Sequence, residues 1–102
     1  MTPTEAATWS AALRSGEFKQ FRGNYMDDYD RPTEFCCLTV GAIVLGHFDL
    51  EDTTRRHIGI TSCVGKLKIN GGGMGQFIHM NDTQGKTFEQ IADYIDEHAE
   101  EL

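Results

Sequence analysis

The sequence has little positive charge. Nine Lys and Arg residues stand against sixteen Asp and Glu residues in 102 positions, which gives a formal net charge of −7 and a pI near 4.9. Proteins that follow the phosphate backbone of a nucleic acid need a basic surface. The charge therefore argues against direct nucleic-acid binding.

Long hydrophobic runs are also missing. The longest apolar run, near Phe35–Leu45, is much shorter than the roughly 20 residues that a membrane-spanning helix needs. The first residues, MTPTEAATW, have neither the basic nor the apolar segment of a signal peptide. We therefore expect no membrane partner and a cytoplasmic location.

Cysteine is scarce and odd in number. Cys36 and Cys37 are adjacent, and Cys63 is the third. A disulfide framework needs cysteines that can pair, so a reducing compartment fits this set better. The cysteines and histidines also lack the C-x2-C and H-x3-H spacings of structural zinc sites, and we expect no bound metal.

The length predicts one domain over residues 1–102, and the 39% hydrophobic and 25% charged residues are typical of globular proteins. Helices are predicted at both ends. Thr2 and Glu5 form a capping-box pattern with Pro3 at the first helical position, and Thr87 and Gln90 repeat it. Apolar residues at helical spacing follow each cap: Ala6, Trp9 and Leu13, then Phe88, Ile91, Ala92, Ile95 and Ala99.

The middle of the chain is harder to interpret. The length of Phe35–Leu45 favours a buried helix ending at Gly46, although its β-branched residues leave a strand open. Lys66–Ile69 alternates polar and apolar residues, and Gln76–Met80 could pair with it across a glycine-rich turn. A further short helix is expected over Leu50–His57.

These elements predict an α+β fold, in which two amphipathic terminal helices and a central apolar helix pack on a short antiparallel β-hairpin. The expected core residues are Trp9, Leu13, Phe35, Leu38, Ile43, Leu67, Ile69, Ile78, Phe88, Ile91 and Ile95.

Several sequence blocks occur in a familiar order. They are Trp9 with Ala12–Gly16 (ALRSG), Phe18-Lys19-Gln20, Phe35–Val40 (FCCLTV), Asn81-Asp82, Thr87-Phe88 and Ile91–Ile95 (IADYI). In these blocks the chain resembles a family of small, largely uncharacterised proteins of bacteriophages and prophages. The resemblance implies a phage origin and expression in a bacterial cytoplasm, and it implies no particular activity.

Two sets of residues could carry catalysis. Cys36 and Cys37 could begin a helix whose amides lower a thiol pKa and create a nucleophile, or they could be small buried hydrophobes. Asp82 could act with His79, or it could belong to a turn that leads into the last helix. No coherent catalytic set emerges, so we expect neither enzymatic activity nor a cofactor.

The glycine run Gly71–Gly75 matches neither a P-loop nor a dinucleotide fingerprint. It is expected to form a hairpin tip that orders on meeting a partner. Alternatively, the amides of Gly72 and Gly73 could hold an anion such as a nucleotide signal, with Lys66, Lys68 and Arg55 offsetting the negative charge.

Aromatic and charged residues alternate before the central apolar segment, a composition typical of an interface anchor with a polar rim. They are Phe18, Phe21, Arg22, Tyr25, Asp27, Asp28 and Tyr29. The sequence therefore favours a small acidic phage protein that binds a host or defence macromolecule without catalysis. The alternatives are a cysteine-dependent enzyme and a nucleotide-binding protein, and a homodimer would enlarge a thin core.

Overall fold

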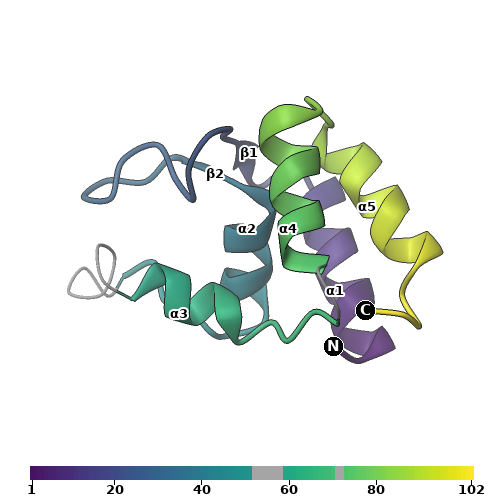
Figure 1. Cartoon of the computed structure of the whole chain (residues 1–102). Coiled ribbons are helices and arrows are strands. Elements are labelled where there is room, and N and C mark those ends of the chain that lie inside the picture. The colour runs from purple at the N-terminus through teal and green to yellow at the C-terminus, as the bar shows by residue number, and fades with distance from the viewer. Residues whose placement is uncertain (52–58, 71–72) are drawn as a thin grey trace.

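The computed structural model describes residues 1–51, 59–70 and 73–102. Helices dominate this part of the chain (Figure 1). The elements in chain order are α1 (Pro3–Arg14), β1 (Lys19–Gln20), β2 (Glu34–Phe35), α2 (Cys37–Val44), α3 (Ile60–Gly65), α4 (Gly73–Ile78), the π-helical turn η2 (His79–Thr83) and α5 (Phe88–Glu97). Within the described ranges, no helix is long and apolar enough to cross a membrane.

The predicted α+β fold with an antiparallel hairpin is wrong. Lys66–Ile69 forms turns and irregular chain after α3, and Gln76–Met80 lies in α4 and η2. In the described residues the one two-stranded sheet is parallel and joins β1 to β2. The physical reason is the helical spacing i, i+3, i+4 of the buried side chains Phe77, Met80 and Asn81, which outweighs the short alternation. The predicted helix over Leu50–His57 lies mostly outside the described residues.

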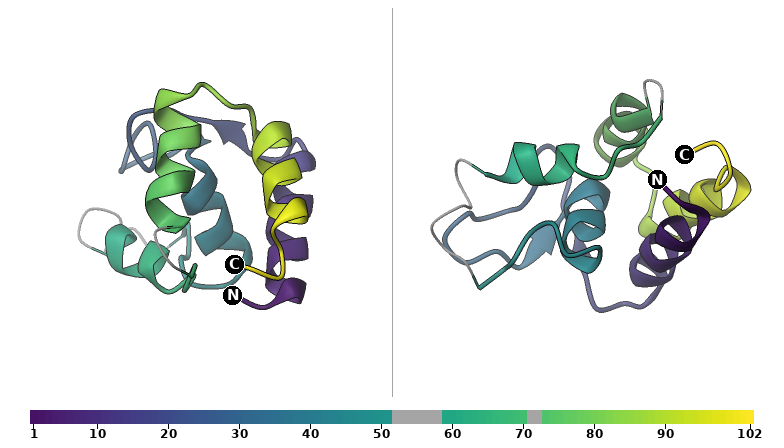
Figure 2. Two further views of the ribbon diagram at one scale, coloured as in Figure 1. Left: turned by 45° about the vertical axis from the view of Figure 1, so that its right-hand side comes forward. Right: turned by 90° about the horizontal axis from the view of Figure 1, so that it is seen from below.

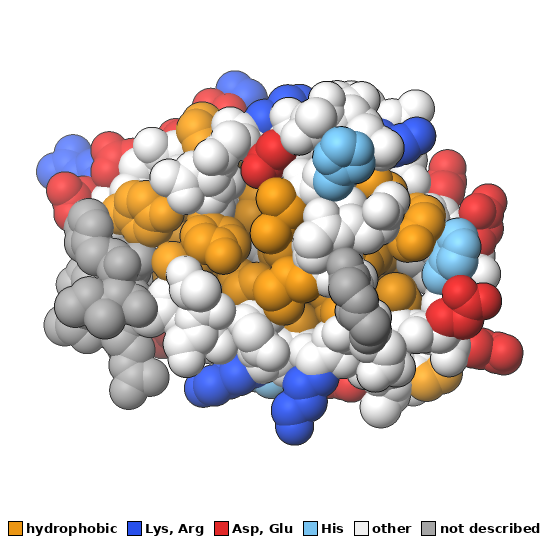
Figure 3. Space-filling model, viewed as in Figure 1, with side chains coloured by type: hydrophobic (Ala, Val, Ile, Leu, Met, Phe, Trp, Pro, Cys, Tyr) orange, Lys and Arg blue, Asp and Glu red, His pale blue; other side chains and the backbone are white. Residues whose placement is uncertain are grey.

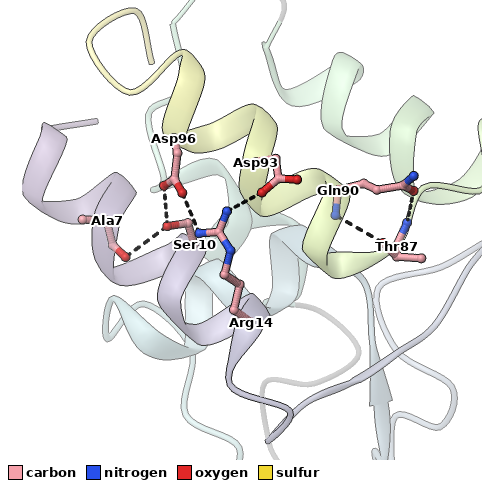
Figure 4. Close-up of polar contacts among 7 residues, drawn as sticks. All are labelled: Ala7, Ser10, Arg14, Thr87, Gln90, Asp93 and Asp96. Atoms are coloured by element: carbon pink, nitrogen blue, oxygen red, sulfur yellow. Dashed lines mark hydrogen bonds and ion pairs between the residues drawn. The ribbon is translucent and has the colours of Figure 1, made fainter.

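The two terminal helices form as predicted, with both capping boxes in place. Thr2 Oγ1 accepts a hydrogen bond from the Glu5 amide at 3.1 Å, and the Thr2 amide donates to Glu5 Oε1 at 2.9 Å. Thr87 and Gln90 make the same reciprocal pair at 3.2 and 2.9 Å (Figure 4). Each cap satisfies amides that a helix end leaves without a partner.

Polar side chains join α1 to α5 along one edge of their contact (Figure 4). Ser10 Oγ donates to Asp96 Oδ1 at 2.7 Å, and the Arg14 guanidinium bridges Asp93 and Asp96. The Ser10 hydrogen bond, followed by that of Arg14, lowers the pKa of Asp96. The two helices also bury Trp9, Ile91 and Ile95 fully in the hydrophobic core.

Helix α2 lies at the centre, between the α1–α5 pair on one side and α3 and α4 on the other (Figure 2). The expected central helix is confirmed over Cys37–Val44, but its predicted first residue, Phe35, lies in β2. The helix ends just before Gly46, whose φ is +80°. Trp9 Nε1 donates to the carbonyl of Cys37 at 2.9 Å. A Cβ at Gly41 would lie 3.0 Å from Trp9 Nε1, so a larger residue there would crowd the indole where α1 approaches α2.

Most expected core residues are buried, with three exceptions. Ile43 and Ile69 are half-buried. Ile78 is 40% exposed, and it is the one large hydrophobic residue of the described chain that is exposed. Its helical neighbour Phe77 is fully buried instead, because α4 turns that face toward Trp9, with the two ring centroids 4.7 Å apart.

Candidate functional site

A pocket of about 200 Å³ opens where the N-terminus of α2, the loop after β1 and the junction of α4 with η2 meet. Its apolar lining comes from Tyr25, Leu38 and Ile78, and the thiols Cys36 and Cys37 extend that lining. Gly23, Asn24, Asn81 and Asp82 supply the polar part of the lining. Hydrophobic side chains gather at the middle of this face of the molecule, between the loop after β1 and α4 (Figure 3).

Asn81 holds the three walls of the pocket together. Its Oδ1 accepts hydrogen bonds from Gln20 Nε2 at 2.9 Å and from the Cys37 amide at 3.3 Å. Its Nδ2 donates to the Phe21 carbonyl at 2.8 Å and to Asp82 Oδ1 at 2.7 Å. The side chain is fully buried, so these bonds satisfy a polar group that water cannot reach. Asn81 therefore caps α2 from a distant part of the sequence.

Asp82 is half-buried and lines the pocket. Its Oδ1 accepts from the Gly23 amide at 2.9 Å as well as from Asn81. Its Oδ2 makes no hydrogen bond or ion pair with any residue that the structure describes. The sequence predicted a turn at Asn81-Asp82, but both residues lie in η2, a π-helical form that is common at functional sites.

The cysteines line the pocket as neutral thiols. Burial raises the pKa of Cys36 and raises that of Cys37 well above its usual value. Cys36 Sγ lies 3.3 Å from Thr39 Oγ1, and Cys37 Sγ donates to the Phe77 carbonyl at 3.7 Å. A protonated buried thiol is a poor nucleophile. The helix N-terminus therefore does not produce the activated cysteine that the sequence left open.

His79, the other half of the hypothetical catalytic pair, has an exposed side chain in η2 and does not line the pocket. Among the described residues, no group of three or more His, Cys, Asp and Glu side chains could hold a metal ion. The pocket thus brings together Cys36, Cys37 and Asp82 from the candidate catalytic set, but without an imidazole.

Of the four aromatic residues predicted to anchor an interface, one lines the pocket and three do not. Phe18 packs edge-on against Phe35, with ring centroids 5.9 Å apart, and Phe21 is half-buried. Tyr25 lines the pocket, and its carbonyl accepts from the Cys36 amide at 2.9 Å, which fixes it against α2. Tyr29 is half-buried in the loop between β1 and β2. Only Tyr25 of the four therefore lines the pocket.

Two charged residues of the predicted interface anchor, Arg22 and Asp27, stabilise the loop between β1 and β2. Arg22 donates to the carbonyls of Asn81 and Lys86. Asp27 accepts from the Thr33 hydroxyl at 2.6 Å, as well as from backbone amides, and these bonds hold its pKa far below the usual range. The carboxylates of Asp27 and Asp28 remain exposed, so the loop also presents negative charge to solvent.

The glycine-rich segment is not a hairpin tip over the residues described. Gly73 begins α4, where a Cβ would overlap the side chain of Ile69, and Gly72 lies outside the described residues. Lys66 and Lys68 line a different hollow, together with His47 and the N-terminal ammonium group. Arg55 is also outside the described residues.

No family model, curated protein or solved structure matches the chain. The site is therefore argued from its own residues. Sequence reasoning missed Gly23, Asn24, Leu38 and Ile78 as lining residues and Asn81 as the organiser. The helical spacing from Phe77 to Asn81 was the available signal, because it places a polar residue on a buried face.

Proposed function

We propose that this chain is a small acidic protein of phage origin that acts by binding, without catalysis, to a protein of the bacterial host or of its defence systems. The main support for this proposal is the surface around the pocket. There the exposed Ile78 and the half-buried Tyr25 lie at an apolar hollow. Apolar anchors beside pockets, enclosed by polar residues, are the centre of many protein interfaces.

The surrounding charge supports the same function. The loop between β1 and β2 presents exposed carboxylates, and the whole chain carries a net charge of −7. Negative potential on one partner accelerates association with a basic partner and excludes acidic ones. The phage origin rests on the resemblance of the sequence blocks described above.

The test compares three forms of the purified protein as bait in extract of a bacterial host: wild type, Ile78→Lys and Ala11→Lys. Ala11 is exposed on α1, so its variant controls for an added lysine. We expect a protein that wild type and Ala11→Lys both retain and that Ile78→Lys loses. The retained protein must then bind the purified chain directly. Equal retention by all three forms, or no direct binding, would contradict the proposal.

A further inference from the structure

We infer that the pocket receives a Lys or Arg side chain from a basic segment of the partner protein, with its aliphatic stem along the apolar lining and its cationic head at Asp82. This inference rests on the proposed function and specifies the chemistry of the partner. It is argued from the size of the pocket, its lining and the position of its one carboxylate.

The size and the lining fit a long side chain. An apolar cavity of about 150 Å³ holds benzene, so a pocket of about 200 Å³ has room for the five non-hydrogen atoms of a Lys side chain or the seven of an Arg side chain. Tyr25, Leu38 and Ile78 offer the apolar surface along which such a stem packs. The Tyr25 ring also favours a cation near its face.

The polar lining of the pocket favours a positively charged group at the end of the inserted side chain. Asp82 Oδ2 is the carboxylate oxygen at the pocket without a partner among the described residues, and an ammonium or guanidinium group would complete its hydrogen bonding. An anionic ligand would instead place like charges together. The thiols of Cys36 and Cys37 are protonated and add no charge to the pocket.

The basic side chain that binds the backbone of η2, Arg22, is already engaged. Arg22 donates to the carbonyls of Asn81 and Lys86, and it forms no ion pair with Asp82. The cation for Asp82 would therefore come from another molecule. The exposed carboxylates of Asp27 and Asp28 belong to the loop whose first residues line the pocket, so further basic residues beside the inserted side chain would also be attracted.

The test uses a matched pair of peptides and amide NMR spectra of the protein. One peptide is acetyl-Lys-Gly-Lys-Gly-Lys-amide, and the other replaces the central lysine with norleucine, which keeps the stem and removes the ammonium group. We expect the lysine peptide to bind about tenfold more tightly, because a hydrogen bond to a charged group is stronger than apolar contact alone. The shifted amides should be those of Gly23, Tyr25 and Asp82.

Asp82→Asn is the informative variant, since its amide oxygen can still accept from the Gly23 amide. This variant should bind the two peptides equally, and Ile78→Ser should weaken both. If wild type binds the two peptides equally, the pocket does not recognise the cationic group, and only the claim of an apolar pocket is left. Binding of n-butylammonium as tight as that of the lysine peptide would overturn the protein partner in favour of a free amine. If neither peptide shifts the pocket amides, the inference fails. The proposed function fails instead if the Ile78→Lys bait retains the same protein as wild type, or if the retained protein does not bind the chain directly.

Discussion

The α1–α5 pair and the pocket region are built in opposite ways. Each terminal helix carries its own cap within four residues of sequence, and the polar bridge between them lies at the rim of an apolar contact. The pocket is not held together by contacts between residues that are close in sequence. One buried amide, that of Asn81, bonds to all three walls, and its partners Gln20, Phe21 and Cys37 lie 61, 60 and 44 residues away. We therefore expect the helix pair to tolerate the loss of a polar contact and the pocket region to depend on it.

Asn81→Ala should have the largest effect on stability. It removes four side-chain hydrogen bonds and leaves buried partners unsatisfied, each of which costs about 1–3 kcal/mol. We expect the free energy of unfolding, measured by urea denaturation, to fall by about 3–5 kcal/mol. Gln84→Ala, an exposed neighbour at the end of η2, is the control and should change it by less than about 0.5 kcal/mol. A variant as stable as wild type would show that Asn81 does not hold the walls together.

Ile91→Ala probes the apolar contact of the helix pair. Ile91 is fully buried in α5, so its truncation removes apolar contacts and leaves a cavity. The free energy of unfolding should fall by about 3 kcal/mol, inside the usual range of about 2–5 kcal/mol. Thermal melts of Ile91→Ala and of Glu89→Ala, an exposed position on the same helix, provide the comparison. A loss larger than that of Asn81→Ala would reverse the ranking of the two regions.

Ser10→Ala tests the polar rim of the helix pair. Ser10 is 3% exposed and donates to the charged Asp96, so the variant should lose about 1 kcal/mol in urea denaturation. Thr8→Ala, on the exposed side of α1, is the control. A loss near that of Asn81→Ala would mean that the two regions depend equally on their polar contacts.

Acid should weaken both regions slightly. The pKa values of Asp27 and Asp96 are lowered in the folded protein, by the Thr33 hydroxyl and by Ser10 with Arg14 respectively. Their stabilisation is therefore fully present above the unfolded value near 3.8 and is lost as the pH falls through the lower folded values. The melting temperature should drop more below that pH for wild type than for Asp27→Asn. A rise in melting temperature on acidification would contradict these shifts.

The same contrast explains what the sequence revealed. The helices after Thr2 and Thr87 were predictable because their caps and apolar stripes are local. The predicted hairpin was wrong because the alternation of polar and apolar residues over Lys66–Ile69 is short. The glycine run next to it is typical of a turn, whereas the spacing of Phe77 and Asn81 is helical. Gly73 of that run begins a helix.

The pocket could be predicted only in part. Tyr25, Asp82 and the paired cysteines were named as candidates, but for separate reasons and separate functions. Ile78 was assigned to the core, because a period of two and a helical period place it on different faces. The link from Asn81 to the start of α2 joins residues that are distant in sequence, and a single sequence carries no record of such a pairing.

Trp9 is the only tryptophan in the chain. Its indole is fully buried, lies against the Phe77 ring and donates to the carbonyl of Cys37, a residue of the pocket lining. The protein thus contains a single indole fluorophore, which lies in α1 and contacts α2 and α4. Because the indole bonds to a residue of the pocket lining, we expect intrinsic tryptophan fluorescence to follow both partner binding and unfolding without a label.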